Sequence, residues 1–207
     1  MNNKLGISIE DWNEVQAIEM GEFETLELGG HEVTIIGAGL YTSDITGNTS
    51  LKVGVDISGN DKQKGYFRKQ YDENTAQDKK WPTGAVRYLS LKKESLAYTK
   101  GFITSLEKSN SNFKFDTSKG WEQIKGLKCC GVFGLEEYQN DKGETKTGIK
   151  LVQFRSLDKL SEVKIPKVKL LDGTFVDYEE YKNKNRNGEE LKKDFGDIVE
   201  ISDDFLD

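Results

Sequence analysis

The chain has 207 residues, of which 35% are hydrophobic and 32% are charged, with 30 Lys and Arg residues against 36 Asp and Glu residues. This length predicts one domain of about 100 to 150 residues with terminal extensions, and the lean apolar content indicates that part of the chain lies outside any core. No apolar run approaches 18 residues and no charged-then-apolar segment begins the chain, so the sequence predicts a cytoplasmic protein with no membrane contact.

The formal charge of −6 is unevenly distributed. Residues 24–173 hold 24 basic against 20 acidic residues (+4), whereas residues 174–207 hold 5 against 11 (−6). We therefore divide the chain into an N-terminal acidic helix over 1–23, a mildly basic domain over 24–173 and an acidic, flexible tail over 174–207. This asymmetry is typical of single-stranded nucleic-acid-binding proteins, because a cationic groove binds phosphate while an anionic tail recruits partners or competes for the groove. A frayed, solubilising terminus is the plainer interpretation of the tail.

The first half of the domain carries strand patterns. Strands are predicted at 32–40, where glycines indicate a bulge or bend, and at 51–57, where Leu, Val and Ile alternate with polar or small residues. A third strand is predicted at 65–71, where aromatic and cationic residues interleave. A polar connection then leads to Trp81 and a short extended piece at 85–91.

The second half predicts a helix followed by a hairpin. Apolar residues fall near one face of a helix over 93–109, and two strands, 126–138 and 147–155, are joined by a polar turn. Residues 182–187 are predicted to be a linker. The order of three strands, a helix and two strands is that of the five-stranded OB barrel. We therefore predict a mainly β fold, an OB-like β-barrel with one helix between strands three and four, although many small barrels and α+β folds share this order.

A resemblance supports this interpretation. Residues 24–167, through the segments 65–71, 78–81, 131–138 and 164–166, resemble an uncharacterised protein family of phages and integrative elements of Gram-positive bacteria. Genes of this kind tend to lie in replication and recombination modules. The resemblance therefore implies work on single-stranded DNA in the cytoplasm of a bacterial host.

The C-terminal tip carries a second resemblance. The tip Asp203, Asp204 and Phe205 is similar to the acidic aromatic tails of bacterial and phage single-stranded DNA-binding proteins. The resemblance implies a docking segment for replication or recombination proteins, which we predict to comprise Asp203, Asp204, Phe205 and Leu206. The bacterial pattern ends on a Pro-Phe carboxylate, whereas here Leu206 and Asp207 follow Phe205.

A sequence-tolerant strand binder needs aromatic rings for stacking and cations for phosphate contacts. The predicted strand at 65–71 supplies both, and alternation places Tyr66 and Arg68 on one face with Phe67, Lys69 and Tyr71 on the other. We favour the face of Tyr66 and Arg68 for the groove, because Phe67 is the natural core residue.

Two further basic aromatic clusters complete the predicted interface. One cluster consists of Lys79, Lys80, Trp81, Arg87 and Tyr88, and its Trp81 is equally well explained as a core or lid residue. The other is the hairpin turn with Lys142 and Lys146 beside Tyr138, and a solvated turn explains these lysines equally well. The candidate nucleic-acid-binding residues are Lys52, Tyr66, Arg68, Lys69, Tyr71, Lys79, Lys80, Trp81, Arg87, Tyr138, Lys142 and Lys146.

The sequence gives little support to an enzyme. The single histidine, His31, lies in a Gly-rich approach to a strand, and a pairing with the adjacent Cys129 or Cys130 lacks a third orienting group. No phosphate loop, metal-ligand spacing or isolated carboxylate pair is present in the sequence, so we predict no catalytic residues, no metal and no cofactor.

The predicted function is therefore sequence-tolerant binding of single-stranded DNA in phage or mobile-element replication and recombination. The alternative is a protein-binding phage factor that modulates a host or recombination enzyme without touching DNA. The sequence leaves the oligomeric state open, with a homo-oligomer as one option, and leaves the preference between DNA and RNA open as well.

Overall fold

The computed structural model describes residues 25–186 of the chain. The strands are β1 (Gly29–Thr42), β2 (Thr49–Ile57), β3 (Val86–Ser90), β4 (Lys128–Gln139), β5 (Thr145–Arg155), β6 (Val168–Lys169) and β7 (Phe175–Val176). The helices are α2 (Tyr66–Glu73), α3 (Leu96–Ser109) and α4 (Tyr178–Arg186), with short 3-10 turns η1 (Thr83–Ala85), η2 (Trp121–Ile124) and η3 (Leu157–Glu162). The predicted mainly β class is confirmed. The predicted N-terminal helix at 1–23 and the acidic tip at 203–206 lie outside the described residues.

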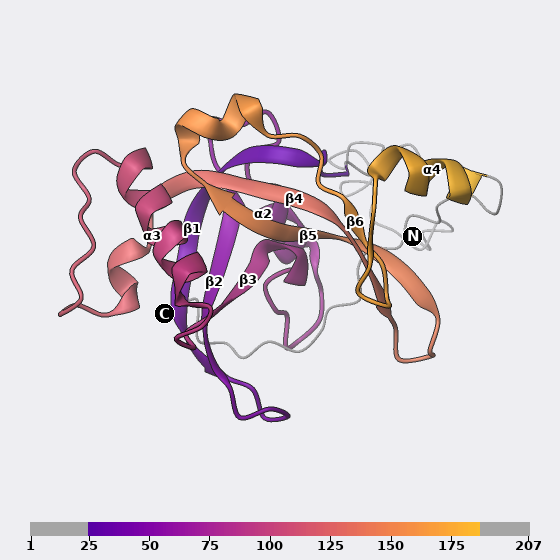
Figure 1. The fold of residues 1–207 in the computed structure, drawn as a ribbon, viewed down its shortest axis with the longest axis horizontal. Coiled ribbons are helices and arrows are strands. Elements are labelled where there is room, and N and C mark those ends of the chain that lie inside the picture. The colour runs from indigo at the N-terminus through magenta and orange to yellow at the C-terminus, as the bar shows by residue number, and fades with distance from the viewer. Residues whose placement is uncertain (1–24, 187–207) are drawn as a thin grey trace, which may run out of the picture.

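All seven strands of the described region belong to one mixed, open sheet. Its order is β3-β2-β1-β4-β6-β7, and β5 also pairs with β4. The pairs are antiparallel except for β4 with β6, which are parallel. In Figure 1 the β1–β2 hairpin projects below the rest of the sheet, while α3 and α4 lie at opposite sides of the molecule.

The strand patterns at 32–40 and 51–57 were predicted correctly, and pairing extends both. β1 and β2 pair from Val33 with Ile57 to Thr42 with Thr49, with a register shift between Ile35 and Gly37. The expected bulge therefore occurs. The inward face of the two strands carries the centre of the core, which includes the fully buried Val33, Ile35, Leu51, Val53 and Val55.

The predicted helix and hairpin of the second half are also present. The turn between β4 and β5 places Gly143 at φ 76°, a left-handed conformation that glycine adopts without strain. α3 packs its Phe102 ring on Phe154 of β5, with ring centroids 4.3 Å apart. The core thus lies between the curved sheet and α3.

The third predicted strand is wrong, because residues 66–73 form α2. Gly65 precedes the helix at φ 68°, and the Asp56 side chain of β2 accepts hydrogen bonds from the backbone N–H groups of Phe67 and Arg68 at 3.1 and 3.3 Å. Phe67 is buried against Phe133, with centroids 5.6 Å apart. The strand that follows β2 in the sheet is β3, which corresponds to the short extended piece predicted at 85–91.

The segment after residue 173 begins with ordered elements. β7 and α4 lie within the range predicted as a tail, and α4 includes most of the predicted linker. Tyr181 of α4 is buried, and its hydroxyl lies 2.6 Å from Thr147 Oγ1 of β5, so α4 packs on the β4–β5 hairpin. Between residues 25 and 186, no helix has both the length and the apolar character that crossing a membrane requires.

Candidate nucleic-acid interface

The face of β1, β2 and β3 that points away from the core presents a row of polar and aromatic residues. In the sheet register, Lys52 pairs with Gly39 of β1 and with Tyr88 of β3. Ser50 pairs with Tyr41 and with Ser90 in the same way. Directly paired residues point to the same face of a sheet. Tyr41 and Tyr88 therefore lie on one face, opposite to the buried Leu51 and Val53, which we call the tyrosine face.

Tyr41 and Tyr88 form an exposed ring pair. Their centroids are 5.1 Å apart with an interplanar angle of 58°, and 38% of Tyr41 and 43% of Tyr88 are exposed. Partial burial, followed by the proximity of Tyr41, raises the pKa of the Tyr88 hydroxyl above its ordinary value. The Tyr88 phenol is therefore neutral at pH 7. Both tyrosines present apolar ring surface with a hydrogen-bonding tip, which is the chemistry that stacks on nucleobases.

A shallow hollow of about 590 Å³ lies beside this ring pair. Hydroxyl and amide side chains dominate its lining, with Lys92 as its single cation and Ser95, the residue before α3, at its edge. The Thr99 hydroxyl of α3 donates to the Ser90 carbonyl of β3 at 2.9 Å, which fixes the helix start against the sheet. The positive end of the α3 dipole and Lys92 therefore act on the same hollow.

Lys52 and Gly39 shape the centre of the tyrosine face. Lys52 is only 5% exposed, so it lies along the sheet rather than extending into solvent. A Cβ atom at Gly39 would have no atom within 4 Å, so the surface beside Lys52 is open. Lys52, which the sequence predicted to bind nucleic acid, therefore lies on the same face as the exposed Tyr41 and Tyr88.

Trp81 lies in an internally stacked group with residues of α2, the segment that was predicted as a separate strand. The Tyr71 and Trp81 rings are 5.6 Å apart, and the Arg68 guanidinium lies 4.9 Å from the Trp81 ring centroid. Trp81 is 5% exposed and its indole N–H donates to the Val55 carbonyl at 3.0 Å. Trp81 is thus a core residue rather than a stacking platform. Tyr66 is half-buried and packs edge-on against Phe67, with centroids 5.1 Å apart.

The β4–β5 hairpin brings a third group together. Tyr138 pairs with Lys146, and the Lys150 ammonium lies 6.0 Å from the Tyr138 ring centroid. The Lys150 ammonium also donates to Thr83 Oγ1 of η1 at 2.8 Å. Burial lowers the pKa of Lys150 from its ordinary value, against the opposing charge of Glu136. Lys150 therefore joins β5 to the segment that leads into β3.

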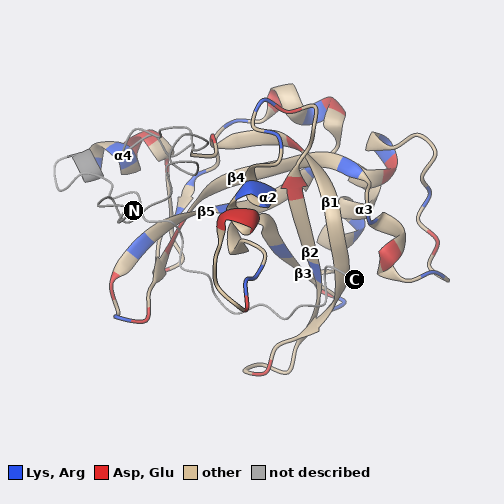
Figure 2. Cartoon of the chain, turned by 180° about the vertical axis from the view of Figure 1, so that it is seen from behind, with Lys and Arg blue, Asp and Glu red and all other residues tan. Residues whose placement is uncertain are grey.

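The remaining predicted cations lie apart from the tyrosine face. Arg87 pairs with Val53, so its side chain points to the other face of β3. Lys142 is exposed in the turn, and Lys146 forms an ion pair of 3.6 Å with Glu144. Figure 2 shows basic and acidic residues interspersed along the loops, helices and hairpins. Positive and negative charges are therefore mixed over the described domain. The feature that distinguishes the tyrosine face is its pair of exposed aromatic rings.

Sequence reasoning missed Tyr41 and Lys92. Tyr41 follows Gly37 and Gly39 at alternate positions, and this spacing is the one signal that could have placed it on an open strand face. Lys92 lies in a loop, where no periodicity exists to assign it.

The histidine and the two cysteines that were considered as catalytic groups are buried in the fold. His31 is buried, with Nδ1 3.2 Å from both Asp61 carboxylate oxygens and Nε2 2.9 Å from the Glu27 carbonyl oxygen. Cys129 and Cys130 are buried and free, and burial raises the pKa of Cys130 to about 11 and that of Cys129 further. Neither thiol is ionised at neutral pH. No group of three metal-ligating side chains occurs within residues 25–186.

The sequence matches no known protein-family model and no curated protein.

Proposed function

We propose that the protein is a sequence-tolerant single-stranded DNA-binding protein of a phage or mobile element, and that the tyrosine face binds the strand. The observation that carries the proposal is the exposed Tyr41–Tyr88 pair, 5.1 Å apart across β2, with Lys52 and the Lys92 hollow beside it. Stacking on such rings tolerates every base, because every base has a π face. Lys92 and the start of α3 supply the attraction for phosphate.

An OB-like barrel is the fold that we propose for this function. The order β3-β2-β1-β4-β5, with a helix between β3 and β4, agrees with the strand order of that barrel. Two contacts connect β5, at one end of this strand order, to η1, which leads into β3 at the other end. The Lys150 ammonium binds Thr83 Oγ1, and a Cβ atom at Gly84 would lie 2.6 Å from the Ile149 carbonyl oxygen. OB barrels bind oligonucleotides on their middle strands, and the tyrosine face lies on those strands.

Binding to a labelled oligothymidine over a range of salt concentrations tests the proposal. We expect affinity to fall with salt at a log-log slope near −0.7 per phosphate contact, and duplex DNA of equal length to bind more weakly because its bases cannot stack. Y41A and Y88A should each cost on the order of 1 to 3 kcal/mol of binding. Phe175→Ala, which removes an exposed ring from the β6–β7 hairpin, is the matched control and should leave affinity unchanged. Absence of binding at micromolar protein would refute the proposal.

The protein-binding alternative has one observation in its favour. Three apolar or aromatic side chains are largely exposed: Leu40 by 65%, Ile45 by 96% and Tyr98 by 77%. Leu40 pairs with Leu51 and therefore points to the face opposite the tyrosine face. Ile45 lies in the turn of the β1–β2 hairpin and Tyr98 in the first turn of α3. Exposed apolar surface of this kind is typical of protein-binding sites. Duplex and single strands that both fail to bind would favour this function.

A further inference from the structure

A second feature of the domain has the chemistry of an anion site. Two cations lie over the Tyr71 ring: the Lys79 ammonium is 4.7 Å and the Arg68 guanidinium carbon is 5.8 Å from its centroid. The same guanidinium lies 4.9 Å from the centroid of Trp81. Trp81 is buried and hydrogen-bonded to β2, so the two rings form a fixed base that holds both cations at the surface.

Neither cation forms an ion pair within the described part of the chain, although the charge of Arg68 acts on the Asp56 carboxylate at the start of α2. Within residues 25–186, Arg68 and Lys79 make no ion pair with a carboxylate, and neither do the adjacent Lys69 and Lys80. Other lysines do form such pairs, as Lys128 does with Glu32 at 2.8 Å. Two like charges beside one ring repel each other, and an anion bound between them relieves that repulsion.

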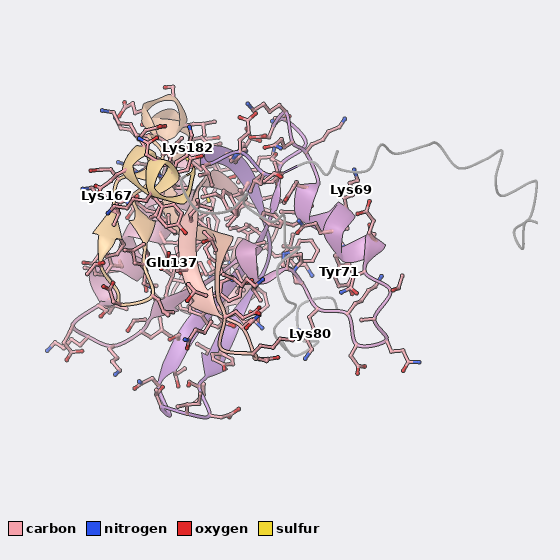
Figure 3. The ribbon with its side chains drawn as sticks, turned by 90° about the vertical axis from the view of Figure 1, so that its right-hand side faces the viewer. Lys69, Tyr71, Lys80, Glu137, Lys167 and Lys182 are labelled. Atoms are coloured by element: carbon pink, nitrogen blue, oxygen red, sulfur yellow. The ribbon has the colours of Figure 1, made fainter. Side chains whose placement is uncertain are left out.

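The surroundings are open to a ligand. Arg68 and Lys69 are exposed, whereas Lys79 and Lys80 are partly exposed. Figure 3 shows Lys69 and Tyr71 on α2 and Lys80 on the following segment at one side of the molecule, away from Lys167 and Lys182. A guanidinium carries its N–H groups in one plane, and two of them bind two phosphate oxygens at once.

We propose that Arg68 and Lys79 form a phosphate clamp, which binds the backbone of the DNA strand whose bases stack on the tyrosine face. This inference rests on the proposed function. The chain connects the two places directly, since Trp81 leads through η1 into β3, which carries Tyr88. Seven residue steps span at most about 25 Å. The two places are therefore no farther apart than a strand within the range of 4 to 16 nucleotides, the site size of OB folds, can reach.

The clamp predicts a dependence on strand length. We compare oligothymidines of 4 and 16 nucleotides with wild type and the double variant R68Q/K79Q. The variant should bind the 16-mer about tenfold more weakly at low salt, and its salt slope should be smaller by about 0.7 for each phosphate group that it no longer binds. Binding of the 4-mer, which the tyrosine face alone accommodates, should change less than twofold. The double variant K114Q/K164Q removes two charges from loop lysines outside α2 and should behave as wild type.

The outcomes separate the clamp from the proposed function. An unchanged salt slope in R68Q/K79Q, or an equal loss in K114Q/K164Q, would overturn the clamp while leaving stacking on the tyrosine face intact. If wild type binds no oligothymidine, the proposed function fails, and titration with inorganic phosphate tests the clamp alone. Phosphate should then shift the NMR signal of the Arg68 side-chain N–H in wild type and not in K79Q. An absent shift in wild type would refute the clamp as well.

Discussion

The Asp56 side chain lies at the N-terminus of α2, where its Oδ1 accepts a hydrogen bond from the backbone N–H of Phe67 at 3.1 Å. Asp56 belongs to β2, so the sheet supplies the cap that Gly65, which has no side chain, cannot supply. Burial raises the pKa of Asp56 above its ordinary value, while hydrogen bonds from backbone N–H groups and the charge of Arg68 act in the opposite direction. The hydrogen bonds to α2 therefore offset only part of the cost of burying this carboxylate.

Asp56→Ala should lower the free energy of unfolding by about 1 kcal/mol, within the range of about 0.5 to 2 kcal/mol known for helix caps. The measurement is urea denaturation at pH 7. Asp56→Asn keeps a hydrogen-bond acceptor in the same place and should lose less. If the alanine variant is as stable as wild type, the hydrogen bonds to α2 contribute nothing measurable.

The same relationship shows where sequence reasoning failed. Alternation at 51–57 was sufficient to predict β2, because one face of that strand is buried along its length. Residues 65–71 mix aromatic and cationic residues, which favoured a strand prediction, yet residues 66–73 form a helix. The cap comes from Asp56, nine residues before Gly65, and neither helix propensity nor periodicity reveals such a contact. Phe67 and Tyr71 are also four residues apart, the spacing of one helix face.

The sequence predicted only some residues of the candidate site, because the site also depends on contacts between segments that are distant in the chain. Lys52 and Tyr88 were visible as a strand lysine and an aromatic residue, but their position on one face depends on the register of three strands. Tyr41 joins them because β1 continues to Thr42 through pairing with β2. Arg68, Tyr71, Lys79 and Trp81 were each named as candidates from the sequence, but as parts of two separate clusters. Their contact with one another and the burial of Trp81 depend on tertiary packing.

Trp81 and Tyr88 should respond to substitution in opposite ways. Trp81→Ala removes a buried ring and its hydrogen bond, and should cost about 3 to 5 kcal/mol of unfolding free energy. Tyr88→Ala should leave stability nearly unchanged and weaken binding of oligothymidine, because its ring is 43% exposed. Thermal melting and a binding titration on both variants check this. A loss of stability in Tyr88→Ala equal to that of Trp81→Ala would place Tyr88 in the core.

Glu32 should make stability depend on pH in the acid range. Burial raises its pKa, but the charge of Lys128 and hydrogen bonds from Lys128, Ser58 and Asn60 outweigh burial and lower the pKa from 4.5. A carboxyl group with a lowered folded pKa stabilises the fold above its unfolded pKa and loses that contribution as pH falls through the folded value. Wild type should therefore exceed Glu32→Gln in unfolding free energy at pH 6, with the difference shrinking below about pH 4.5. A difference that is constant from pH 6 to pH 3 would contradict this assignment.

Gly84 and Gly101 should respond to alanine with opposite signs. A Cβ atom at Gly84 would lie 2.6 Å from the Ile149 carbonyl oxygen, so Gly84→Ala must push η1 away from β5 and should cost about 1 to 3 kcal/mol. A Cβ atom at Gly101 of α3 would have no atom within 4 Å, so Gly101→Ala should stabilise the fold by up to about 1 kcal/mol. Urea denaturation measures both. Equal stability of Gly84→Ala and wild type would show that η1 and β5 are not in close contact.

The acidic C-terminus should act on the proposed strand site through its charge. Residues 194–207, which lie outside the described residues, carry six carboxylates and no Lys or Arg. Their attraction to the lysines of the domain competes with phosphate at low ionic strength and is screened within about 10 Å at 0.1 M salt. Deleting residues 194–207 should therefore tighten oligothymidine binding modestly at low salt, with a gain that shrinks as salt rises. Replacing the same carboxylates by amides should reproduce the gain, which separates charge from chain length. If the truncated protein binds as wild type at every salt concentration, the tail does not compete with DNA for the strand site. If the truncated protein unfolds, residues 194–207 are part of the fold.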